Sequence, residues 1–140
     1  MNNLDDLYAL AEEEHIEIFA FSLPSTSSVS IMELDGTCYI GIDPFRVDSY
    51  VQEAQHLAHE LGHCITGSFY NQYSNCDIRA RHEYKANKWA IKKLIPQDEL
   101  EAAVNSGFTE PWELAEYFNV PVPFMQKAVE YYKEQALAYA

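Results

Sequence analysis

Two histidines one helical turn apart, His59 and His63, with Glu60 directly after the first, constrain this chain more than any other feature. Side chains four residues apart lie on one face of an α-helix, about 6 Å apart along its axis. If residues 50–64 form a helix, both imidazoles can bind one zinc ion, and Glu60 lies about 100° around the helix, beside the metal. A carboxylate there suits a general base for the water that zinc activates. The pattern therefore predicts a site for one zinc ion, with Glu60 as the catalytic residue.

A peptidase zinc site needs a third protein ligand and an open position for water. Glu83 is the best candidate, near the start of a helix predicted from Asp77 to Ile95. Asn87 follows Glu83 by one turn, so its amide oxygen can accept the outward N–H of a zinc-binding histidine and fix the ring orientation. The sequence leaves three alternatives open for the third ligand: His82, Asp77 and Cys76.

Gly62 lies in the middle of the predicted zinc helix, where glycine costs about 1 kcal/mol relative to alanine. Its missing side chain would let another backbone approach the helix close to the metal. Cys64 is expected to be a small buried residue that projects away from the metal face.

Peptide hydrolysis also needs a donor for the charge that develops on the attacked carbonyl oxygen. Tyr70 and Tyr73 lie between the two predicted metal helices and are candidate donors, with a structural role as the alternative in a chain of ten tyrosines. The strand predicted at Cys38–Ile42 precedes the zinc helix and is expected to be a sheet edge near the cleft. An extended peptide can add to such an edge through backbone hydrogen bonds.

The remaining patterns predict an α+β fold: a small, mostly antiparallel three-stranded sheet packed on the zinc-binding helices, with a helical C-terminal subdomain. An Asp35–Gly36 pair predicts a hairpin with a tight type I′ turn. We expect a zinc-binding core over residues 1–96 and the helical subdomain over 97–140, as parts of one compact unit. The other elements expected from periodicity and turn residues are helices at Asn3–Glu14, Tyr50–Cys64, Gln97–Asn105, Glu110–Phe118 and Pro123–Ala138, and strands at Ile16–Phe21 and Val29–Glu33.

Composition excludes some classes of function. The chain has 140 residues and a net charge of −13, so binding to nucleic acid would be repulsive overall. No stretch approaches the roughly 18 apolar residues of a membrane span. The start of the chain lacks the pattern of a signal peptide. Its three cysteines, an odd number, suit no closed disulfide framework. Free thiols without an export signal indicate a cytoplasmic protein.

Three segments together resemble the ImmA/IrrE family of metallopeptidases: LAHELGHCITG at 57–67, EYKANKWA at 83–90 and LIP at 94–96. The resemblance covers residues 39–96 well and the flanks more loosely. It implies zinc bound by His59, His63 and Glu83, with Glu60 catalytic. At position 87, many members have Asp where this chain has Asn, which also accepts a histidine N–H. The resemblance further implies a protein substrate, a helix-turn-helix repressor, because members on phages and integrative elements relieve repression by cleavage.

Residues 112–124 look like a helix-turn-helix. The second helix offers two bases against two acids, so we expect a packed subdomain or a surface that docks the substrate, without direct DNA binding. The four residues concerned are Lys127, Lys133, Glu130 and Glu134. The alternative to a peptidase is a zinc-containing anti-repressor that acts only by binding its target. Glu60 discriminates between the two, because pure binding has no use for a base beside the metal.

Overall fold

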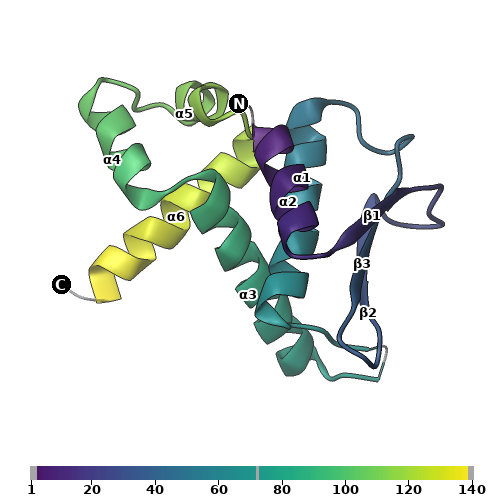
Figure 1. The fold of residues 1–140 in the computed structure, drawn as a ribbon. Coiled ribbons are helices and arrows are strands. Elements are labelled where there is room, and N and C mark those ends of the chain that lie inside the picture. Colours follow the sequence, from purple (N-terminus) through teal and green to yellow (C-terminus); the bar gives the residue numbers. More distant parts are fainter. Residues whose placement is uncertain (1–2, 72, 139–140) are drawn as a thin grey trace. The chain divides into compact units, whose positions relative to one another are not determined.

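The computed structural model describes residues 3–71 and 73–138, and the chain divides into two compact units, residues 1–90 and 91–140 (Figure 1). The first unit contains helices and a three-stranded sheet, which confirms the α+β class, and the described part of the second is helical. The elements of the first unit are α1 (Asn3–Glu13), β1 (Glu17–Ala20), β2 (Ser28–Met32), β3 (Cys38–Ile42), α2 (Tyr50–Thr66) and α3 (Cys76–Leu94), the last turn of which belongs to the second unit.

The sheet is mixed, with the strand order β1-β3-β2. β2 pairs with β3 antiparallel, but β1 pairs with β3 parallel, so the expectation of a mostly antiparallel sheet is wrong. The expectation that Cys38–Ile42 forms a sheet edge is also wrong, because β3 is the central strand. The reason lies in the segment between β1 and β2. It is too long for a tight turn, so it crosses the end of β3 and leaves β1 and β2 on opposite sides of that strand.

Asp43, at the end of β3, holds this crossing segment in place. Its buried carboxylate accepts a 2.9 Å hydrogen bond from the Leu23 N–H, and its own N–H donates to the Ser27 carbonyl at 2.9 Å. The bond from Leu23 is the largest influence that holds the pKa of Asp43 below its usual range. The buried acid therefore satisfies backbone donors that the crossing would otherwise leave unpaired.

The β2–β3 hairpin is confirmed, but its turn is not type I′. A type I′ turn needs a positive φ at both central residues. Gly36 has a φ of 90°, whereas the described non-glycine residues with positive φ are His15 and Asn119. The Gly36 N–H donates to the Glu33 carbonyl, and the Glu33 N–H donates to the Thr37 carbonyl. The hairpin loop therefore consists of residues 34–36, which is one residue more than a two-residue type I′ turn contains.

Helix α2 packs on one face of the sheet, against β2 and β3, and α1 lies alongside it (Figure 1). Leu57 and Leu61 of α2 are fully buried, as is Ile40 of the central strand. The helix begins after Ser49, whose side chain accepts from the Gln52 N–H. It ends two residues later than expected, with Gly67 in the left-handed conformation.

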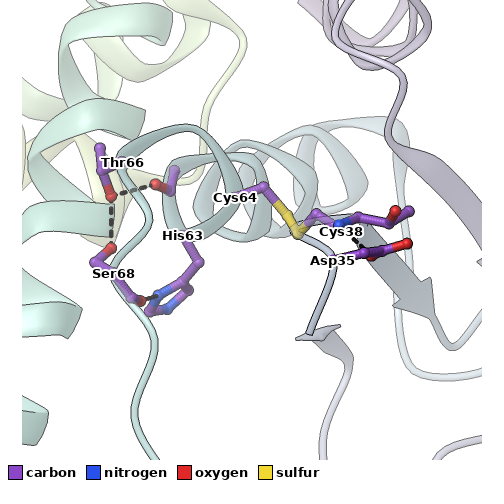
Figure 2. The surroundings of a disulfide bond; sticks show 8 residues. Asp35, Cys38, His63, Cys64, Thr66 and Ser68 are labelled. Atoms are coloured by element: carbon purple, nitrogen blue, oxygen red, sulfur yellow. Dashed lines mark hydrogen bonds between the residues drawn. A yellow bond between two sulfur atoms is a disulfide. The ribbon is translucent and has the colours of Figure 1, made fainter. Parts of the chain in front are cut away.

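A disulfide joins Cys38 of β3 to Cys64 of α2, with an S–S distance of 2.01 Å (Figure 2). The expectation of free thiols is therefore wrong for two of the three cysteines, and Cys76, which is exposed, is the free one. Cys64 is half-buried and bonded rather than a simple packing residue. The inference of a cytoplasmic location from free thiols loses its basis. Within the described residues, no helix has both the length and the apolar character that a membrane span requires.

The second unit contains α4 (Gln97–Asn105), α5 (Pro111–Phe118) and α6 (Val122–Ala138), within one residue of the predicted bounds. Asn119 adopts a φ of 55° and ends α5, and the Val120 N–H returns to the Ala115 carbonyl. This tight turn before α6 agrees with the helix-turn-helix pattern of the sequence. The expected division of the chain after Pro96 stays a prediction.

Loss of the Cys38–Cys64 disulfide should lower the free energy of unfolding by about 3 kcal/mol, because the bond closes a loop with a sequence separation of 26. The measurement is urea unfolding of the C38S/C64S variant, with Cys76→Ser as the matched control. The control should unfold at the wild-type urea concentration. Equal midpoints for all three proteins in oxidising buffer would contradict the disulfide.

Candidate metal centre

Helix α2 presents two imidazoles to the same point. His59 Nε2 and His63 Nε2 are 3.2 Å apart, which their spacing of one helical turn allows. The His63 side chain is nearly buried, and that of His59 is one-quarter exposed. The pair is therefore more accessible to solvent at His59 than at His63.

Glu83 of α3 completes this cluster. Its Oε2 lies 3.0 Å from His59 Nε2, and its Oε1 lies 3.1 Å from His63 Nε2. Of the candidate third ligands, the structure brings Glu83 to the histidines. The ring of His82 instead lies 6.4 Å from that of Tyr70. The other two candidates, Cys76 and Asp77, are exposed in the first turn of α3.

Gly62 allows the close approach of α3 to α2. A Cβ atom at this position would lie 2.5 Å from the Ala86 carbonyl oxygen, a distance that real contacts do not show. Ala86 is fully buried, and it lies between Glu83 and Asn87 on α3. The expectation that Gly62 lets another backbone approach near the site is confirmed.

The outward nitrogens of both imidazoles contact oxygen acceptors. His59 Nδ1 lies 2.8 Å from Asn87 Oδ1, and His63 Nδ1 lies 2.5 Å from the Ser68 carbonyl oxygen. Each Nδ1 therefore carries a proton, so in the neutral rings each Nε2 has a lone pair that points into the site. This contact is the one that the sequence predicts for Asn87.

Sequence reasoning missed Ser68, because its contact uses a backbone carbonyl that any residue possesses. Its position depends on Gly67, which reverses the chain after α2. The fully buried Ser68 hydroxyl pairs with Thr66 Oγ1, which in turn donates to the Gly62 carbonyl (Figure 2). A glycine followed by a small polar residue after the second histidine is the only sequence signal for this support.

The donor set fits a metal ion. The two imidazole Nε2 atoms are 3.2 Å apart, and each lies 3.0 or 3.1 Å from one oxygen of the Glu83 carboxylate. Converging acceptors without protons repel one another, and a cation at their centre removes that repulsion. His59, His63 and Glu83 are thus the residues that could hold a metal.

Glu60 lies beside this cluster rather than in its centre. One of its oxygens is within 4.8 Å of a ring nitrogen of both histidines, and its side chain is buried. Glu60 Oε2 accepts a 2.6 Å hydrogen bond from Ser28 Oγ. No local sequence pattern indicates a role for Ser28, because the contact joins residues 32 positions apart on a strand and a helix.

The two tyrosines expected as oxyanion donors, Tyr70 and Tyr73, differ from each other in their contacts and exposure. The Tyr70 hydroxyl donates to Glu83 Oε1 at 2.8 Å, and this bond is the main reason why the pKa of Tyr70 is raised. Tyr70 thus supports the candidate third ligand in this conformation. Tyr73 is 86% exposed, and its N–H bonds to Asn71 within the loop. The role of either tyrosine as an oxyanion donor stays a prediction.

A helix with two histidines and a glutamate, joined by a carboxylate from the next helix, is an arrangement suited to metal-dependent hydrolysis. The family described as Peptidase_M78, IrrE N-terminal-like domain, matches residues 11–130. The chain therefore belongs to this metallopeptidase family, and the resemblance seen in the sequence is confirmed. Comparison with curated proteins gives no match.

Substitution of Gly62 by alanine should destabilise the first unit by about 2 kcal/mol, because the new methyl group overlaps the Ala86 carbonyl. The helix-propensity gain of about 1 kcal/mol offsets only part of that cost. The variant should also have a lower affinity for any metal ion held by the cluster, because α3 carries Glu83. Urea unfolding and chelator competition measure the two effects. Gln55→Ala, on the same helix, is the control and should leave both unchanged, whereas wild-type values for Gly62→Ala would show that the close approach is unnecessary.

Proposed function

We propose that the chain is a zinc-dependent endopeptidase that cleaves a helix-turn-helix repressor and thereby relieves repression of a mobile element. The observation that carries this proposal is the convergence of His59, His63 and Glu83, with the Glu60 carboxylate directly beside them. Membership of a metallopeptidase family supports the reaction class.

Zinc is the metal that this donor set favours. Two imidazole nitrogens and one carboxylate are typical ligands of a catalytic zinc site, which keeps a fourth position open. Ligands bound tetrahedrally at about 2.0 Å are separated from one another by about 3.3 Å. The observed separations of 3.0, 3.1 and 3.2 Å are close to that value. The three side chains therefore need little movement to bind one zinc ion.

Glu60 is proposed as the general acid and base. A bound zinc ion supplies Lewis acidity, which polarises the scissile carbonyl and makes water easier to deprotonate. Glu60 accepts the proton of the attacking water and later returns it to the leaving amine. Asn87 and Ser68 hold the imidazole rings by their outward nitrogens, so that the Nε2 atoms stay directed into the site.

Strand β2 is the sheet edge that we propose for the substrate, in place of β3. Two backbone hydrogen bonds flank β2: the Asp43 N–H donates to the Ser27 carbonyl, and the Glu33 N–H donates to the Thr37 carbonyl. They show that the odd-numbered residues of this strand make the backbone hydrogen bonds to β3. Because pairing alternates in an antiparallel ladder, the even-numbered residues direct their backbone groups outward. These residues are Ser28, Ser30 and Met32. An extended peptide added here would lie beside Glu60, which contacts Ser28.

The repressor as target rests on the family resemblance. The second unit offers apolar side chains for docking a protein: Trp112 of α5 is 60% exposed and Tyr117 is 51% exposed. Aromatic side chains of this kind are enriched where proteins bind one another. Direct DNA binding is not proposed, because α6 has no excess of basic residues and the chain is strongly acidic.

Replacement of Glu60 by glutamine should abolish cleavage, because an amide cannot accept the proton of water, while zinc binding persists. Cleavage is measured by mass spectrometry after incubation with each member of a panel of purified helix-turn-helix repressors, and zinc by elemental analysis. Glu83→Ala is the contrasting variant, and it should lose both zinc and cleavage.

Cleavage by the glutamine variant at the wild-type rate would disprove the role of Glu60. A repressor that is bound but left intact by the wild type would instead favour a non-cleaving anti-repressor. Unchanged zinc content after Glu83→Ala would show that another residue is the third ligand.

A further inference from the structure

The hydroxyl of Ser28 is a buried polar group that contacts a charged side chain. Its Oγ donates to Glu60 Oε2 at 2.6 Å, and both residues are less than 10% exposed. A hydrogen bond from a neutral hydroxyl to a carboxylate is short and strong when water is excluded. We propose that Ser28 is a positioning residue that fixes the orientation of the catalytic base. The proposal rests on the function proposed for Glu60 above.

Glu60 needs such a partner because its own helix fixes only its Cα and Cβ atoms. The side chain has three torsions, and its last torsion is broad. A hydrogen bond to Oε2 restricts the carboxylate plane and leaves Oε1 to take the proton of the attacking water. One Glu60 oxygen already lies within 4.8 Å of both imidazoles, so a small rotation would change its distance from the water. Small misplacements of a catalytic group cost large factors in rate.

The backbone around Ser28 holds its hydroxyl in place. Ser28 lies opposite Ile42 at the start of β2, on the sheet face that packs against α2. Thr26 Oγ1 donates to the Ser28 carbonyl at 3.1 Å, and the neighbouring Ser27 carbonyl accepts from the Asp43 N–H. These contacts fix the strand end independently of Glu60. Ser28 therefore keeps its position when the Glu60 side chain rotates, and its hydroxyl can hold the base in one orientation.

The same strand is the proposed substrate edge. Ser28 directs its backbone outward toward an added peptide and its hydroxyl inward toward the base. A peptide that pairs with β2 is then placed by the same residue that orients Glu60. This arrangement fixes the base and the scissile bond relative to one another, which proximity catalysis requires.

Replacement of Ser28 by alanine should lower kcat for repressor cleavage about tenfold, with KM and zinc affinity unchanged. Ser28→Thr keeps a hydroxyl and a residue type that strands accept, so it should restore kcat to within about twofold of wild type. Ser25→Ala removes an exposed hydroxyl from the segment before β2, outside the proposed substrate edge, and is the matched control with the wild-type kcat.

A second measurement uses the zinc-free protein. The ¹³C resonance of the Glu60 side-chain carboxylate, assigned by its absence in Glu60→Gln, should move in Ser28→Ala and stay in place in Ser25→Ala. An unmoved resonance would overturn the contact, and a wild-type kcat in Ser28→Ala would overturn the positioning role. If the wild type cleaves no repressor, the proposed function fails, while the resonance still tests whether Ser28 holds Glu60.

Discussion

The approach of α3 to α2 at Gly62 is the contact on which the rest of the site depends. Two histidines on one helix supply only two donors, and the third has to come from another element. The missing side chain at Gly62 lets the Ala86 backbone lie against α2, which places Glu83 at 3.0 and 3.1 Å from the two imidazoles. A larger residue would separate the helices and move Glu83 away from the two imidazoles.

Around these donors, a set of hydrogen bonds fixes the orientation of each side chain. Asn87 and the Ser68 carbonyl hold the outward nitrogens of the rings, and the Tyr70 hydroxyl contacts Glu83. The Ser28 hydroxyl contacts Glu60. These partners come from α3, from the loop after α2 and from β2. The site is therefore preorganised by the fold of the first unit, and its members lie within residues 28–87.

Local patterns in the sequence predict the parts of the site that lie along one element. Helical periodicity places His59, Glu60 and His63, and the same periodicity places Asn87 one turn after Glu83. Element bounds agree within one or two residues because caps and turn residues such as Ser49 and Gly67 determine them locally.

Local sequence patterns do not predict contacts between elements that are distant in the chain. The parallel pairing of β1 depends on a segment that crosses β3, and that path is stabilised by Asp43, which sequence reasoning left without a role. The prediction of free thiols from the odd number of cysteines is wrong, because three cysteines leave room for one bonded pair, Cys38–Cys64, and one free thiol. Ser28 and Ser68 resemble any other serine until the fold brings them to the site.

The central claim is that this chain binds zinc through two imidazoles and one carboxylate. Zinc K-edge X-ray absorption of the purified, zinc-loaded protein tests it most directly. The account predicts nitrogen and oxygen scatterers at about 2.0 Å, with the outer-shell signal of two imidazole rings. A sulfur scatterer at about 2.3 Å, or the loss of only one imidazole signal when both His59 and His63 are replaced by alanine, would contradict it.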